Sequence, residues 1–287
     1  MKIVTDSAAE LSTEEREAHD ITVAPLLIQF PEGVVAAEDI GPDDFYNRLR
    51  DMFPVIPTTS QPSAGVFRDI YEKLHINGSE ILSIHISSGL SGTIESARTG
   101  AQEKSEAQVT LVDTLTLSGG QRYQVLAAAW AIKAGWGKER IIELLRKIQK
   151  ATEVVFTLDT LDYLARGGRI GRVQALAGSL LRLKPLIAVD EQDGKYNTVG
   201  KERTLQRAIS KIADHLHAQY GKTTPMWVTV LHGQFSEQAE NLTEKLKERL
   251  NVARLEVLRV SPVLGVHTGP GVVGAAVVPL ELMEISA

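Results

Sequence analysis

The feature that most constrains this fold is an alternation, in the first half of the chain, between short apolar runs and segments with helical periodicity. Three runs bounded by turn residues read as strands, at Lys2–Val4, Ile81–Ile86 and Val109–Val112. The helical segments span residues 63–75, 92–102 and 118–134. Strands that alternate with helices form parallel sheets covered by helices. The sequence therefore predicts an α/β fold with a parallel sheet in its N-terminal part.

The order of elements changes after a last strand-like run, Val154–Leu158. The pattern then predicts short helices around Leu161–Leu181 and a hairpin from Leu186 to Val199 turned at Asp193-Gly194. A helix over 203–220, a strand at 227–231, a further helix and strands at 255–260 and 275–280 follow, with an irregular stretch over 261–274. We therefore expect an N-terminal α/β domain over residues 1–158 and a C-terminal α+β domain over residues 159–287.

The composition excludes several classes of protein. The 31 basic and 36 acidic residues are spread along the whole sequence, so no basic cluster offers a nucleic-acid footprint. The lack of cysteine excludes disulfides and thiolate nucleophiles. The most apolar helix-like run, Val125–Ile132, is too short to span a bilayer. We expect a soluble, cytoplasmic protein that does not bind nucleic acid and does not insert stably into a membrane.

Two hydroxyl-rich loops stand where a sheet of this kind binds ligands, which is beyond the carboxyl ends of its parallel strands. The segment Pro57–Ser63 leads into a predicted helix, and Ser87–Thr93 follows a predicted strand and opens another helix. Free backbone N–H groups and the helix dipole attract an anion to such positions. Helix capping explains about one hydroxyl per helix, and the two loops carry more than that. The pattern indicates an anion site, with capping alone as the alternative.

Six motifs carry a resemblance to one bacterial family. They are Thr5-Asp6-Ser7, Thr59-Ser60-Gln61-Pro62-Ser63, Ser87-Ser88-Gly89-Leu90-Ser91-Gly92-Thr93, Tyr163-Leu164-Ala165-Arg166-Gly167-Gly168-Arg169-Ile170, Leu183-Lys184-Pro185 and His267-Thr268-Gly269-Pro270-Gly271. In their order and spacing the chain resembles the DegV family of bacterial fatty-acid-binding proteins over almost its entire length. The family pattern usually has Asp-Ser where this chain has Asp113-Thr114.

The resemblance implies a two-domain protein that buries an acyl chain between its domains. It implies that hydroxyls of Thr59 and Ser91 hold the carboxylate of a long-chain fatty acid, with His267 near the head group. The supporting loop residues would be Ser60, Gly92 and Thr93. At roughly 0.8 kcal/mol per buried methylene, a chain of about fifteen methylenes offers on the order of 12 kcal/mol. We therefore expect the tail to supply the affinity, and neutral donors instead of an arginine to orient the head group.

The resemblance also implies a partner and a role without catalysis. Family members act as the fatty-acid-binding subunit of bacterial fatty acid kinase and present the carboxylate to a separate ATP-binding subunit, which makes an acyl phosphate. Arginines at the positions of Arg172 and Arg203 would help that subunit engage the phosphoryl group. Solvated arginines near a helix end are the ordinary alternative. No cofactor is expected.

A serine esterase is the alternative function. The segment Gly89-Leu90-Ser91-Gly92-Thr93 follows a strand and opens a helix as a nucleophile elbow does, but the G-x-S-x-G pattern requires glycine where Thr93 stands. Ser91, His267 and an Asp could still form a triad, since triads are defined by geometry. The G-x-G-x-x-G match at Gly269–Gly274 runs into a strand instead of a helix, which argues against a dinucleotide site. No metal-binding motif occurs.

Overall fold

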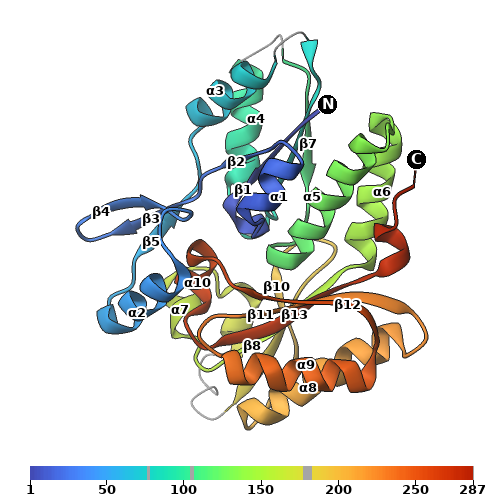
Figure 1. Cartoon of the computed structure of the whole chain (residues 1–287). Helices are drawn as coiled ribbons and strands as arrows, with labels where there is room; N and C mark the ends of the chain where they lie inside the picture. The colour runs from blue at the N-terminus through green and yellow to red at the C-terminus, as the bar shows by residue number, and fades with distance from the viewer. Residues whose placement is uncertain (76–77, 104–106, 177–182, 287) are drawn as a thin grey trace.

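Two β-sheets, one in the upper and one in the lower half of Figure 1, organise the chain. The computed structural model describes residues 1–75, 78–103, 107–176 and 183–286. The upper sheet has the order β2-β1-β6-β7, and all of its pairings are parallel. Its strands are β1 (Lys2–Asp6), β2 (Ile21–Ala24), β6 (Ile81–His85) and β7 (Val109–Asp113). This is the parallel sheet that the βα alternation predicts.

The lower sheet is mixed and has the order β10-β9-β8-β13-β11-β12. Its strands are β8 (Glu153–Leu158), β9 (Lys184–Val189), β10 (Tyr196–Glu202), β11 (Pro225–His232), β12 (Asn251–Arg259) and β13 (Val272–Pro279). Only the β11–β12 pairing is parallel among those described. The predicted hairpin is present as β9 and β10, and Gly194 in its turn has the positive φ of 64° that favours glycine. The predicted fold class is confirmed.

Strand β8 shows how the chain passes from one sheet to the other. It lies just before the predicted boundary at residue 158, yet it pairs with β9 and β13 of the lower sheet. The last strand assigned to the first domain therefore completes the second sheet. The division into 1–158 and 159–287 remains a prediction, and sheet pairing favours a boundary ahead of β8.

Helices cover both sheets and also fill the space between them (Figure 1). The upper half contains η1 (Ser7–Ala9), α1 (Thr13–Ala18), α3 (Ala64–Leu74), α4 (Thr93–Glu103), α5 (Ser118–Lys133) and α6 (Lys138–Ala151). Helix α5 contacts β1 and β6 of the upper sheet and β8 and β13 of the lower one. Its residues are therefore buried on almost every side. Gly119 permits this closeness, because a Cβ there would lie 2.6 Å from that of Ala276 on β13.

The lower sheet is covered on its outer face by α8 (Leu205–Tyr220) and α9 (Ser236–Arg249). Each packs an apolar stripe against the strands, as the spacing in the predicted helix over 203–220 indicates. The chain ends with η5 (Leu280–Met283), which packs against α6, β11 and β13. No described helix has the length and hydropathy required to cross a membrane. Within the same residues, no group of three His, Asp or Glu side chains is arranged to hold a metal ion.

Three regions differ from the sequence-based expectation. A small antiparallel sheet projects from the side of the molecule (Figure 1). It consists of β3 (Leu27–Phe30), β4 (Gly33–Ala36) and β5 (Thr58–Ser60), and α2 (Pro42–Met52) connects β4 to β5. The stretch 261–274, expected to be irregular, contains α10 (Pro262–Thr268) and the start of β13. The short helices expected over 161–181 are α7 (Asp162–Arg166) and η3 (Gly171–Leu176), and residues 177–182 lie outside the described part.

Candidate functional site

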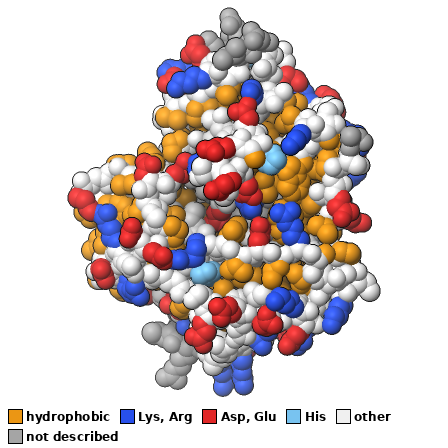
Figure 2. Space-filling view, in the orientation of Figure 1, with side chains coloured by type: hydrophobic (Ala, Val, Ile, Leu, Met, Phe, Trp, Pro, Cys, Tyr) orange, Lys and Arg blue, Asp and Glu red, His pale blue; other side chains and the backbone are white. Residues whose placement is uncertain are grey.

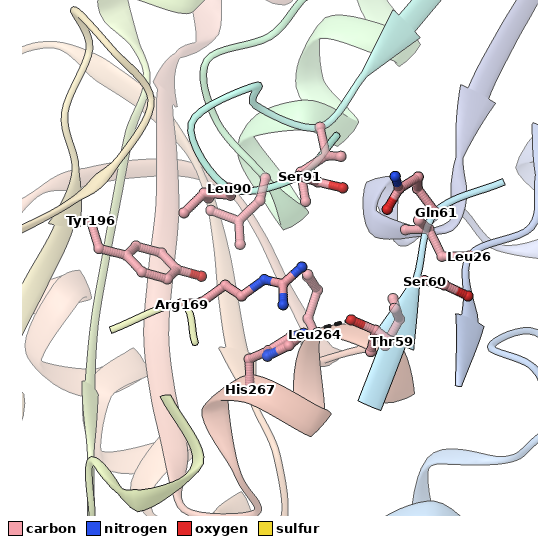
Figure 3. A pocket seen from close by; sticks show the side chains of 13 residues that line it. Leu26, Thr59, Ser60, Gln61, Leu90, Ser91, Arg169, Tyr196, Leu264 and His267 are labelled. Atoms are coloured by element: carbon pink, nitrogen blue, oxygen red, sulfur yellow. Dashed lines mark hydrogen bonds between the residues drawn. The ribbon is translucent and has the colours of Figure 1, made fainter. Parts of the chain in front are cut away.

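A pocket opens where β5, the β6–α4 loop and α10 meet (Figure 3). Segments of both halves of the chain form its walls, because β5 and the loop belong to the N-terminal half and α10 to the C-terminal half. Its lining residues are Leu26, Thr59, Ser60, Gln61, Ile86, Leu90, Ser91, Leu117, Arg169, Tyr196, Val263, Leu264 and His267. The pocket therefore contains four of the six residues predicted for a fatty-acid site.

Thr59 and His267 are in direct contact. Oγ1 of Thr59 lies 2.8 Å from Nε2 of His267. Strand β5 presents Thr59 through its pairing with Ile28 on β3, and α10 packs against β3 and β5. The other ring nitrogen, Nδ1, is buried and has no hydrogen-bond partner among the described residues. The backbone of Gly167 lies against it, since a Cβ there would be 2.2 Å from Nδ1.

The His267 ring is uncharged at neutral pH. Burial and, to a smaller extent, the positive charge of Arg169 lower its pKa to about 3. Only 8% of the residue is exposed, which agrees with burial as the main cause. A neutral imidazole carries one N–H donor and one acceptor nitrogen, so His267 can act as a neutral hydrogen-bonding group beside an anion.

Ser91 lies in the β6–α4 loop, across the pocket from His267 (Figure 3). Its hydroxyl lies 2.8 Å from Oγ1 of Thr93, a buried residue, and accepts a hydrogen bond from the Thr93 backbone N–H. Gly92 brings this loop close to the β5 segment, because a Cβ at Gly92 would lie 3.1 Å from Nε2 of Gln61. The two hydroxyl-rich loops of the sequence thus meet in one pocket.

The turn of the β9–β10 hairpin lies against the same loop. The Ser87 hydroxyl donates a hydrogen bond of 2.8 Å to the carbonyl oxygen of Gly194. A Cβ at Gly89 would lie 2.4 Å from the carbonyl oxygen of Asp193, so the loop glycine permits this close approach. The lower sheet therefore supports the loop that carries Ser91.

Arg169 brings a permanent positive charge into the pocket. Its Nη1 donates a hydrogen bond of 2.9 Å to the Gly167 carbonyl oxygen, and its guanidinium lies between His267 and the Leu90–Ser91 segment in Figure 3. The pocket is therefore not lined by neutral donors alone, and the expectation that neutral donors orient the head group remains a prediction. The motif Tyr163–Ile170 contained this residue, but sequence spacing could not show that it turns toward α10.

A second pocket, almost entirely apolar, adjoins the first and shares Leu117, Tyr196 and Leu264 with it. Its further lining residues are Ser118, Val154, Val155, Phe156, Leu231, Val260, Thr268, Val272, Gly274 and Ala275. The space free of atoms is about 490 Å³ in the first pocket and about 380 Å³ in the second, part of it open to solvent. A pocket that holds hydroxyl groups and a positive charge, beside an almost entirely apolar pocket, suits an amphiphilic anion.

Arg172 and Arg203, predicted to face a partner, do not line the pocket. Arg172 forms ion pairs with Asp190 and Asp193 beside the hairpin turn, and half of its side chain is exposed. Arg203 is exposed between β10 and α8. Both are accessible to another protein, and neither contributes to the pocket wall.

The hydrogen bonds do not favour Ser91 as an esterase nucleophile. Its hydroxyl bonds with Thr93, whereas Nε2 of His267 bonds with Thr59. A different Ser–His–Asp array occurs in the upper sheet, where His85 lies 2.7 Å from the Ser83 hydroxyl and 3.0 Å from the Asp6 carboxylate. These three residues are 0% exposed, so no substrate reaches them.

The chain is similar to bacterial proteins over nearly its whole length. A family model described as an uncharacterised protein of the DegV family matches residues 1–280. A DegV domain-containing protein of Deinococcus radiodurans is 37% identical over 277 residues, covering 96% of this chain and 95% of that protein. A solved DegV family protein from Thermus thermophilus, described by its fatty acid binding, is 32% identical with a TM-score of 0.90, covering 97% and 99%.

Two further solved structures are similar in the same way. DegV from Bacillus subtilis, described as a fatty acid binding protein, is 32% identical with a TM-score of 0.86 and covers 96% of this chain and 98% of its own. A stearic acid-binding protein from Eubacterium ventriosum is 27% identical with a TM-score of 0.86, covering 97% and 98%.

Proposed function

Because this chain belongs to the DegV family, we propose that it binds a long-chain fatty acid in the two adjoining pockets, with the carboxylate at Thr59, Ser91 and His267. The observation that carries the proposal is that the pocket with the hydroxyls and Arg169 shares Leu117, Tyr196 and Leu264 with an adjoining, almost entirely apolar pocket. The solved relatives described as fatty acid binding proteins support the choice of ligand.

The head group is oriented by hydroxyl donors and attracted by one charge. In the neutral His267 ring, an N–H at Nε2 donates to Oγ1 of Thr59, which leaves the Thr59 proton free to donate to the carboxylate. Ser91 supplies a second hydroxyl from the opposite wall. Arg169 balances the negative charge, which would otherwise be costly to place in a partly buried site.

The tail supplies most of the affinity. Each methylene that leaves water contributes roughly 0.8 kcal/mol, so the apolar pocket stabilises the complex more than a few hydrogen bonds do. Val154, Phe156 and Val272 belong to the hydrophobic core that faces the upper half of the molecule, so the tail lies between the two sheets.

We also propose that the protein is a carrier without catalytic activity of its own. It would present the carboxylate to a separate ATP-binding subunit of fatty acid kinase, which forms the acyl phosphate. The exposed Arg172 and Arg203 are the residues proposed to contact that subunit or the phosphoryl group. No cofactor takes part on this chain.

Extraction of the purified, folded protein into organic solvent, followed by mass spectrometry, tests the ligand. We expect a long-chain fatty acid in stoichiometric amount, and folded protein that neither yields nor rebinds any fatty acid would exclude the proposal. The carrier role is tested separately with a purified kinase subunit. ATP alone should leave the bound fatty acid unchanged, whereas ATP with that subunit should give an acyl phosphate that hydroxylamine traps.

A further inference from the structure

One side of the apolar pocket adjoins a polar groove on the molecular surface. The groove is lined by residues from the end of β1 to α1, from the β4–α2 connection and from the end of β12 to the start of α10, among them Glu10, Arg16, Glu38, Arg259, Ser261 and Pro262. Figure 2 shows this side of the molecule hollowed between its upper and lower halves, with charged side chains around the hollow. Val260 lines the apolar pocket and Ser261 lines the groove, so the β12–α10 connection separates the two spaces.

Two side chains complete this separation. The Glu10 carboxyl group accepts a hydrogen bond from the hydroxyl of Ser118 and another, of 2.8 Å, from the backbone N–H of Ser261. Ser118 lines the apolar pocket, whereas Glu10 lines the groove. The Glu10–Ser118 pair therefore stands between an apolar space and water.

The backbone at both residues has an uncommon conformation. Glu10 has φ of 53° and Ser118 has φ of 52°, in the left-handed region that residues other than glycine rarely adopt. Such conformations persist only where surrounding contacts hold them, and they cluster at functional sites. Here the two conformations place the carboxyl of Glu10, the residue that ends η1, against Ser118, the first residue of α5.

We propose that Glu10 and Ser118 form the end wall of the acyl-chain pocket and set the longest acyl chain that the protein accepts. The proposal rests on the proposed function, because it takes the tail to run from the carboxylate site past Leu264 into the apolar pocket. A tail that reaches Ser118 meets a hydroxyl already bonded to Glu10. A longer tail would have to separate that pair and leave the carboxyl without a partner on its apolar side.

Saturated fatty acids from C12 to C24 test the wall in displacement titrations. Affinity should rise about fourfold per added methylene and then level off or fall at the length where the tail reaches Ser118. In Glu10→Gly, which removes the side chain and suits a positive φ, we expect this limit to move at least two carbons longer, with a tenfold or greater gain for the first excluded length relative to C16.

Three further variants make the test decisive. Ser118→Asn, which tolerates a positive φ and extends into the pocket, should move the limit to shorter chains and decides the matter if Glu10→Gly does not fold. Glu10→Gln keeps the shape of the wall and should keep the limit, and Glu14→Ala removes a nearby exposed charge as a control. Folded Ser118→Asn and Glu10→Gly proteins with the wild-type limit would overturn the wall and leave the proposed function intact. A folded wild-type protein that binds no fatty acid would overturn both.

Discussion

The Thr59 hydroxyl lies 2.8 Å from Nε2 of His267, which is 208 residues further along the chain. This contact joins β5 of the small side sheet to α10, so two elements absent from the sequence-based prediction meet at the candidate site. The hydrogen bond to His267 also fixes the position of the Thr59 hydroxyl. The consequences for ligand binding and for stability can be measured separately.

Thr59→Val keeps the shape of the side chain and removes its hydroxyl. We expect fatty-acid affinity to fall by about tenfold or more, since a hydrogen bond to a charged group contributes about 1.5–3 kcal/mol. Isothermal titration calorimetry measures the change. Thr58→Val is the matched control, because the exposed Thr58 hydroxyl bonds to Gln29 outside the pocket. Equal affinities for the two variants would show that the carboxylate does not contact Thr59.

Ser91→Ala should weaken binding to a similar extent, and the double variant Thr59→Val/Ser91→Ala tests whether both hydroxyls hold one carboxylate. We expect coupling between the two changes, because loss of one donor lets the head group shift away from the other. A double-mutant cycle on dissociation constants measures it. Additive effects would indicate two separate contacts. The same Ser91→Ala protein should show no change in short-chain ester hydrolysis, whereas a Ser91-dependent rate would support an esterase.

Arg169→Met removes the positive charge and keeps much of the side-chain length. We expect the preference for a fatty acid over the corresponding fatty alcohol to fall by about tenfold or more, because the charge acts on the carboxylate alone. Competition titrations with the two ligands give this ratio. Arg166→Met serves as the control, since Arg166 is exposed and its guanidinium lies over the ring of Phe53. A ratio unchanged in Arg169→Met would place the carboxylate elsewhere.

The buried neutral His267 makes the fold sensitive to acid. Its pKa is lowered from 6.5 to about 3, so the unfolded chain takes up a proton below pH 6.5 that the folded chain does not. Stability is therefore present above pH 6.5 and is lost as the pH falls, by about 2 kcal/mol between pH 7 and pH 5. Urea unfolding of His267→Gln should show a smaller loss over this range. An identical pH dependence in both proteins would contradict the burial of a neutral ring.

Glu10 should have the opposite effect. Burial raises its pKa to about 7 despite the hydrogen bonds from Ser118 and Ser261 and the charge of Arg122, and the buried Tyr46 lies close by. The folded chain therefore holds a proton that the unfolded chain releases near pH 4.5, and this stabilisation is lost as the pH rises through 7. Glu10→Gln should be more stable than the wild type at pH 8 by about 1–2 kcal/mol, because the wild-type carboxyl must ionise in a buried site at that pH, and by much less at pH 4.5. A stability difference that does not change with pH would argue against a raised pKa.

Particular residues show what the sequence could predict. Helices such as α3 and α8 have a long apolar stripe and a clear cap, so their periodicity locates them within one or two residues. Strands β3, β4 and β5 have three or four residues each, too few for a period to be recognised. Strand β8 was located from its apolar run, but pairing with β9 and β13 depends on contacts that a local pattern does not encode.

The site divides in the same way. Thr59, Ser91 and His267 were identified from family motifs, and the structure places all three in one pocket. Sequence reasoning does not identify Arg169 as a pocket residue, because its orientation depends on a hydrogen bond to the Gly167 backbone and on the position of α10. Neither feature has a recognisable sequence pattern, and α10 is distant in the sequence. The Glu10–Ser118 contact joins residues 108 positions apart, and neither side chain has a motif that suggests it.

The support that the β9–β10 turn gives to the Ser91 loop, through Ser87 and Gly194, has a kinetic consequence. One wall of the candidate site is held in place by the opposite half of the molecule, so a chain whose halves have moved apart would have no complete site. Measured affinity is then the intrinsic affinity multiplied by the fraction of molecules in the docked state. The rate of ligand exchange would then depend on how often the halves separate. A substitution at Ser87 or Gly194 should alter the rate of ligand release although neither residue lines the pocket.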